Sequence, residues 1–108
     1  MRTRRATASA CLLELAQFME RFYTVNLQYH QDTAGADVAL PTPQCRSDLA
    51  GIYTFGFNGA VTARAYVIEA APQGRQTRDA CATLRIDQSG RKDLVGAAAG
   101  TTVAQCWR

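Results

Sequence analysis

The chain has 108 residues, of which 47% are hydrophobic and 19% charged, and its formal net charge is +3. This length fits one domain, and the composition is that of a globular protein rather than a disordered one. The positive excess is too small for a dedicated nucleic-acid-binding domain, and no apolar run reaches the ~20 residues that cross a bilayer. We therefore expect a single domain over residues 1–108.

Residues 1–25 are expected to form one long helix. The part from Thr3 to Val25 contains no glycine or proline and is rich in good helix formers. Apolar side chains recur there every three or four residues and predict a stripe wide enough to lie on a sheet. They are Cys11, Leu12, Leu15, Phe18, Met19 and Phe22. Arginines precede this stripe where positive charge opposes the helix dipole, so the natural helix is expected to continue upstream.

Residues 26–51 read as a long connecting loop, because proline, glycine and aspartate interrupt every periodicity. Loops of this length in compact domains are usually functional or pinned. The loop holds His30, the one residue that could act as a general base near neutral pH. No arrangement typical of a catalytic triad accompanies it, so we interpret His30 as a surface histidine.

Residues 52–87 are expected to form antiparallel strands. The segment 52–57 is aromatic and β-branched, and the dipeptide Asn58-Gly59 that follows predicts a hairpin. A second strand is expected over 61–71. A third, over 82–87, alternates with Leu84 and Ile86 directed inward.

The end of the chain is expected to contain a small-residue loop over 93–100 and a last edge strand over 103–107. One helix followed by strands favours an α+β fold. We therefore predict a long N-terminal helix packed on one face of a three- or four-stranded antiparallel sheet.

Four cysteines in so short a chain indicate disulfides rather than reactive or metal-binding thiols, since there is no Cys-x-x-Cys pair. A bridge between Cys81 and Cys106 would close a loop of about 26 residues and contribute roughly 3.5 kcal/mol in the chain-entropy model. Cys11 and Cys45 would then tie the 26–51 loop to the helix, the alternative being two buried free thiols. Three connectivities exist for four cysteines, and this pairing is the favoured one.

No nucleotide, protease or metal-ligand motif is present, so the sequence predicts no enzyme, no catalytic residue, no metal and no cofactor. Positive charge is in excess between residues 64 and 92 and could follow a phosphate backbone. The residues proposed to contact DNA or a surface are Arg64, Arg75, Arg78, Arg91 and Lys92. A solvated sheet edge is the alternative interpretation.

Four stretches, taken in order, resemble parts of one known family. They are Arg4–Asn26, Tyr66–Gly74, Cys81–Gly90 and Val103–Trp107. They are similar to segments of type IV pilins, and of PilE-like proteins in particular: the lower half of the long helix, then a strand and its exit. The third stretch is similar to the pattern Cys-Gly-x-Leu-x-x-(Asp/Asn)-Gln-x-Gly, with Ala82 in place of glycine, and the fourth to a terminal Cys-Trp.

The resemblance implies the type IV pilin fold, with Cys81 and Cys106 bridged around the D-region. Pilins begin with a cleaved leader and an apolar half-helix, and neither is seen here. The resemblance therefore implies a soluble domain whose missing N-terminal segment anchors the protein in the membrane. It also implies inner-membrane assembly machinery, oxidation in the periplasm of a Gram-negative bacterium, and an extracellular pilus. Other pilin subunits would pack against the helix and the loops 26–51 and 88–105.

The predicted function is that of a structural pilus subunit, foremost a PilE-like minor pilin in pilus assembly, with twitching, adhesion or DNA uptake downstream. The alternatives are a major pilin, a pilin that binds DNA or a surface through its basic residues, and a pseudopilin of type II secretion. Many pseudopilins are stabilised by calcium in the C-terminal region rather than by a disulfide. Cys81 and Cys106 therefore favour the pilin interpretation.

Overall fold

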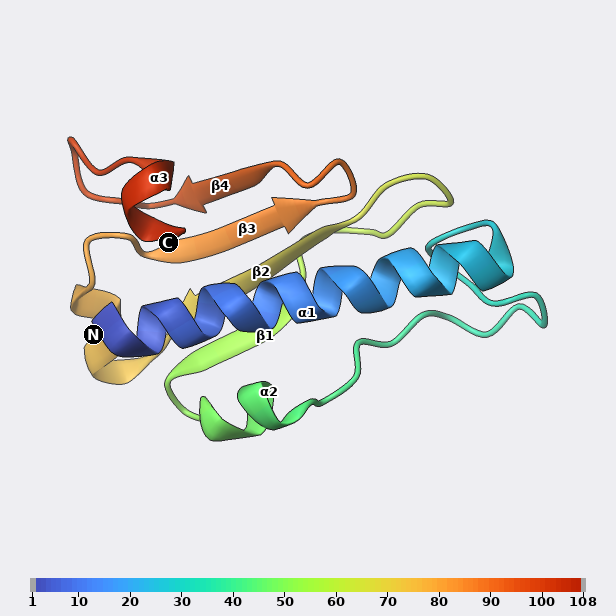
Figure 1. The fold of residues 1–108 in the computed structure, drawn as a ribbon, viewed down its shortest axis with the longest axis horizontal. Coiled ribbons are helices and arrows are strands. Elements are labelled where there is room, and N and C mark those ends of the chain that lie inside the picture. Colours follow the sequence, from blue (N-terminus) through green and yellow to red (C-terminus); the bar gives the residue numbers. More distant parts are fainter. Residues whose placement is uncertain (1, 108) are drawn as a thin grey trace.

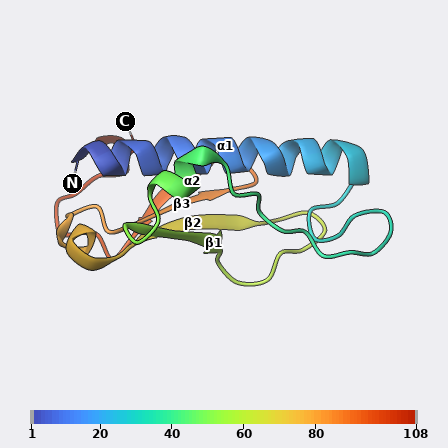
Figure 2. The same ribbon diagram turned by 90° about the horizontal axis from the view of Figure 1, so that it is seen from below.

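The computed structural model describes residues 2–107. A long helix, α1 (Arg2–Asn26), runs along one face of a four-stranded antiparallel sheet (Figures 1 and 2). The strands lie side by side in chain order: β1 (Tyr53–Phe57), β2 (Val67–Pro72), β3 (Thr83–Asp87) and β4 (Lys92–Val95). The shorter helical elements are α2 (Gln44–Asp48), the 3₁₀ helix η1 (Gly74–Arg78) and α3 (Val103–Cys106). The predicted α+β architecture is therefore confirmed.

Helix α1 forms one side of the core. Its 25 residues extend over about 38 Å, close to the 42 Å length of the molecule. The stripe buries Cys11, Leu12 and Leu15 almost completely, whereas Phe18 and Phe22 are only half-buried. Among residues 2–107, no helix combines the length and the apolar character needed to cross a membrane.

Strands β2 and β3 supply the other side of the core. Ile68 lies opposite Ile86 in the register, and both side chains are buried together with Leu84. Glu69 and Arg85, which are opposite each other on the outer face, form an ion pair at 3.1 Å. The inward direction of Leu84 and Ile86 is the one that the alternation predicts.

The connection between β1 and β2 is longer than expected, so the prediction of a tight hairpin with a strand from residue 61 was wrong. The chain is irregular over residues 58–66, and β2 begins at Val67. Backbone groups of this segment form hydrogen bonds within it and to the 26–51 loop. The N–H of Thr62 donates to the carbonyl of Ala65 at 2.9 Å, and the N–H of Tyr29 donates to the carbonyl of Ala63 at 3.0 Å. The segment therefore packs against the 26–51 loop instead of extending the ladder.

The end of the chain also differs from the prediction. The fourth strand is β4, which lies largely in the expected loop over 93–100, and the expected edge strand over 103–107 is the helix α3. Thr102 and Gln105 form a reciprocal capping box at the start of α3, which satisfies backbone N–H groups that a helix start leaves free. This local bonding favours helix over strand.

The 26–51 loop contains α2, which the sequence analysis does not predict. A disulfide between Cys11 and Cys45 ties this region to α1. Arg46 of α2 donates hydrogen bonds to the carbonyls of Pro41, at 3.0 Å, and Phe55, at 3.2 Å. The loop is thus held both to the helix and to the edge strand β1.

The second disulfide joins Cys81, just before β3, to Cys106 in α3, so the structure contains the two bridges that the sequence favours. Ala82, which lies between Cys81 and the first residue of β3, has a φ of 53°. This left-handed region suits glycine, since a side chain is strained there. The backbone therefore gives a physical reason for the glycine that the pilin pattern has at this position.

Candidate functional site

The five basic residues proposed to contact DNA do not form one cluster. Because β2 and β3 are antiparallel, Arg64, Arg91 and Lys92 lie at one end of the sheet. Arg75 and Arg78, in η1, lie at the opposite end, near the start of α1 (Figure 1). Strands of this length separate the two ends by about 17 Å. We call the first group the turn end and the second the η1 end.

The η1 end is fastened to α1 by a buried ion pair. One guanidinium nitrogen of Arg5 lies 2.8 and 2.9 Å from the two carboxylate oxygens of Asp79, whose side chain is only 3% exposed. Gln76 and the backbone N–H of Cys81 also donate to this carboxylate, at 3.2 and 3.0 Å. The negative charge of Asp79 is therefore fully engaged inside the protein.

Exposed arginines occur in both elements that this ion pair joins, the start of α1 and η1. The first turn of α1 and the first turn of η1 contain no acidic residue, and no ion pair of the arginines there is found among residues 2–107. They are Arg2, Arg4, Arg75 and Arg78, all exposed. The sequence analysis did not propose Arg2 and Arg4 as contact residues, although their closeness in the chain was visible. Positive charge at the η1 end is thus largely uncompensated.

The turn end has a more balanced charge. A cleft of about 170 Å³ there is lined by Arg85 and Arg91 but also by Asp87 and Asp93. Lys92 stacks over the Trp107 ring, 5.7 Å from its centroid. Acidic and basic groups alternate here, which weakens the attraction for a polyanion.

Asp87 organises the turn between β3 and β4. Its carboxylate accepts hydrogen bonds from the N–H and hydroxyl of Ser89, at 2.9 and 2.6 Å, and from the N–H of Arg91, at 3.1 Å. Burial raises the pKa of the Asp87 carboxyl. These hydrogen bonds and the charge of Arg91 lower the pKa by more than burial raises it, so the pKa lies below its ordinary value. The carboxylate thus serves the turn as a fixed acceptor.

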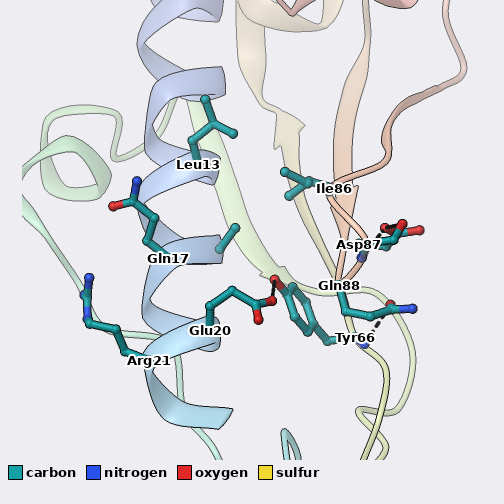
Figure 3. A pocket seen from close by; sticks show the side chains of 11 residues that line it. Leu13, Gln17, Glu20, Arg21, Tyr66, Ile86, Asp87 and Gln88 are labelled. Carbon is teal, nitrogen blue, oxygen red and sulfur yellow. Dashed lines mark hydrogen bonds between the residues drawn. The ribbon is translucent and has the colours of Figure 1, made fainter. Parts of the chain in front are cut away.

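A groove of about 590 Å³ opens between α1 and the β3–β4 turn. Figure 3 shows Leu13 and Glu20 on the helix side and Ile86 on the strand side, with Tyr66 at the lower end. The Glu20 carboxylate accepts hydrogen bonds from the hydroxyls of Tyr29, at 3.0 Å, and Tyr66, at 3.3 Å. No feature of the sequence predicted this groove, because its two walls are distant in the chain.

Tyr29 and Tyr66 are expected to make the protein less stable at alkaline pH. Burial, with the hydrogen bond to Glu20 and its charge, raises the pKa of Tyr29 from 10.0 to about 12, and burial and Glu20 raise the pKa of Tyr66 as well. A raised pKa contributes stability that is complete below pH 10 and is lost as the pH rises through the folded-state values. We expect the free energy of unfolding, measured by urea denaturation, to fall above about pH 10.

The matched control for this pH dependence is Tyr66→Phe, which keeps the ring and removes the ionisable hydroxyl. This variant should lose less stability between neutral and alkaline pH than the unmodified protein, because one fewer tyrosinate forms beside Glu20. An identical pH dependence in both proteins would contradict the role assigned to Tyr66. Absorbance titration of the tyrosinates gives an independent measurement of the pKa values.

His30 and the group of Cys11, Glu14 and Cys45 are not arranged for acid–base catalysis or metal binding. The Nδ1 atom of His30 is buried and, within the described part of the chain, has no hydrogen-bond partner, so no group orients this ring as a general base. Ligand atoms of Cys11, Glu14 and Cys45 lie within 4.8 Å of one another. Both sulfurs belong to the disulfide and therefore present no thiolate to a metal.

Comparisons with known proteins agree with this architecture. A protein-family model described as the type IV minor pilin ComP, DNA uptake sequence receptor, matches residues 1–85. A solved structure, a type IV pilin from Shewanella oneidensis, aligns with a TM-score of 0.63 and 26% sequence identity, covering 99% of this chain and 97% of that chain. None of the curated proteins compared with the chain matches it. Pilins are structural subunits, and this chain belongs to the ComP family of type IV minor pilins.

Proposed function

We propose that this minor pilin binds DNA in the course of DNA uptake, and that the η1 end is the contact surface. The family model carries the description of a DNA uptake sequence receptor, which is what brings DNA into consideration. The single observation that supports the location is that the start of α1 and η1, which the Arg5–Asp79 ion pair joins, hold exposed arginines with no ion pair among residues 2–107. This group lies within the matched residues 1–85, whereas Arg91 and Lys92 lie outside them.

The arginines would act mainly on the DNA backbone. Guanidinium groups neutralise phosphates and release counterions, so binding through them weakens steeply as salt rises. Contacts to phosphates set the position of a protein on a duplex, while sequence is read at the base edges. An arginine beside a groove can also donate two hydrogen bonds to guanine, so the same residues can contribute to recognition of a particular sequence.

The test compares two double variants with the same change in charge. Arg75→Ala with Arg78→Ala removes the η1 arginines, and Arg64→Ala with Arg91→Ala removes two arginines of the turn end. We expect the first to weaken binding to duplex DNA by about tenfold in a mobility-shift titration and to reduce the salt slope by about 2. The second should change both quantities much less, because Asp87 and Asp93 lie beside Arg91 and compensate its charge.

All four arginines are exposed, so both variants should keep the circular dichroism spectrum and melting temperature of the unmodified protein. A larger effect from Arg64→Ala with Arg91→Ala would transfer the site to the turn end. Absence of any shift by the unmodified protein at low salt would contradict DNA binding itself.

The family also supports finer proposals about partners and location. We infer that the protein is anchored in the inner membrane by an N-terminal segment, is handled there by the assembly machinery, and is then carried in an extracellular pilus. Contacts with neighbouring pilins would involve α1 and the loops 26–51 and 88–105. Immunolabelling of surface filaments, present in wild-type cells and lost in cells without the assembly machinery, tests these proposals together.

A further inference from the structure

The two asparagines of the chain are followed by very different residues. Asn58 precedes Gly59, and Asn26 precedes Leu27. An asparagine can lose its side-chain amide when the backbone nitrogen of the next residue attacks its Cγ atom. A following glycine hinders this attack least, because it has no Cβ and its backbone turns freely. Asn58-Gly59 is the sole Asn-Gly pair in the sequence, so the two asparagines offer a comparison within one molecule.

Asn58 and Gly59 lie where the chain leaves the sheet after β1 (Figure 1). The N–H of Asn58 donates to the carbonyl of Val67 at 2.9 Å, so the β1–β2 ladder ends here and the next peptide lies outside it. Both residues are exposed. Among residues 2–107, neither the side-chain amide of Asn58 nor the N–H of Gly59 forms a hydrogen bond. The two reacting groups are therefore open to solvent and free to turn toward each other.

Asn26 has the opposite surroundings. Its Nδ2 donates to the carbonyl of Phe22 at 3.0 Å, and its Oδ1 accepts from the N–H of Thr33 at 3.2 Å. The N–H of Leu27, which would have to attack, donates to the carbonyl of Tyr23 at 2.7 Å. The same reaction would have to break these hydrogen bonds, so the fold protects this asparagine.

We propose that Asn58 is a site of spontaneous deamidation, with water as the co-reactant. The backbone nitrogen of Gly59 forms a bond to Cγ of Asn58, the Cγ–Nδ2 bond breaks, and the backbone proton leaves with Nδ2 as ammonia. Water then opens the resulting succinimide ring. Addition at Cγ gives aspartate, and addition at the main-chain carbonyl carbon gives isoaspartate, in which the backbone runs through the former side chain. No oxidant or reductant takes part.

The new carboxylate changes the charge of the turn end. Asn58 lines the cleft of about 170 Å³ there. The charged residues of this cleft are Arg85, Arg91, Asp87 and Asp93. A cleft with equal numbers of basic and acidic side chains thus gains one acidic group, which makes it less attractive to a polyanion. The η1 end is not touched, so the inference is independent of the DNA contact proposed there.

Comparison of the folded and the denatured protein tests the proposal. Both are incubated at mildly alkaline pH with the disulfides intact, the second in guanidinium chloride. Peptide mass spectrometry follows the two asparagines, since deamidation adds about 1 Da. We expect the rate at Asn58 in the folded protein to lie within about threefold of its rate in denaturant, whereas folding should slow Asn26 by more than about tenfold. Protection of both asparagines by tenfold or more would overturn the proposal.

Two variants of Asn58 identify the site and its product. Asn58→Gln keeps an amide but needs a larger ring for the same attack, so it should form no acidic species during incubation. Asn58→Asp should co-elute in ion exchange with the aspartate form of the aged protein. Both variants change an exposed side chain and should keep the melting temperature. An acidic species that forms equally fast in Asn58→Gln would contradict the proposal. These readouts involve no DNA, so failure of this proposal and failure of DNA binding are distinguishable.

Discussion

Replacing Cys81 and Cys106 together by alanine is expected to lower the free energy of unfolding by about 3.5 kcal/mol. The two cysteines are separated by 25 positions in the sequence, so loss of the disulfide increases the chain entropy of the unfolded state considerably. Trp107 also holds this part of the chain, since its Nε1–H donates to the carbonyl of Asp93 at 3.2 Å and its ring lies beneath Lys92. Urea denaturation by circular dichroism measures the loss.

The matched control removes the other disulfide with Cys11→Ala and Cys45→Ala. Its sequence separation is 34, so the chain-entropy model gives a loss of about 3.8 kcal/mol. The two variants should differ in which part of the protein unfolds locally. Hydrogen exchange should accelerate in β4 and α3 for the first, and in residues 27–52 for the second. A loss below about 1 kcal/mol for the first variant would contradict the role assigned to its disulfide.

Arg5→Met should also destabilise the protein strongly, by about 3 kcal/mol. The substitution leaves the Asp79 carboxylate buried without its positive partner, and a buried unpaired charge is costly. Asp79 also receives hydrogen bonds from Gln76 and from the N–H of Cys81. Disturbance there should therefore reach the start of β3. The measurement is again the free energy of unfolding from urea denaturation.

Arg4→Met is the control for this prediction, since Arg4 lies on the same turn, is exposed and is expected to change stability by less than about 0.5 kcal/mol. The double variant Arg5→Met with Asp79→Leu removes both charges and should recover much of the loss, because apolar groups can replace a buried ion pair. Equal stability of the Arg4→Met and Arg5→Met proteins would contradict the account of the ion pair.

The parts of the fold that were predicted correctly are those in which apolar residues recur at a regular spacing. The α1 stripe of Cys11, Leu12 and Leu15 and the alternation of Leu84 and Ile86 each reflect one element facing one core. The segments that were predicted wrongly have weak periods. Their conformation depends on specific hydrogen bonds rather than on periodicity. These are the local capping box of α3 and the backbone bond between the segment before β2 and the 26–51 loop. The capping residues, Thr102 and Gln105, were visible in the sequence but were outweighed by the expectation of an edge strand.

The long amphipathic helix and the antiparallel strands could be predicted from the sequence, because they follow from spacing along the chain. The sequence favoured one of three cysteine pairings, and the structure contains that one. Which charged and apolar groups share a surface depends on how the elements pack, and this could not be predicted from the sequence. Antiparallel pairing separates Arg64 from Arg75 by the length of a strand, while the Arg5–Asp79 ion pair joins η1, which holds Arg75, to the start of α1. The groove, too, exists only because α1 crosses the sheet beside a turn that is distant in the chain. Periodicity describes how one element meets its core, but proximity between surfaces is set by how several elements pack.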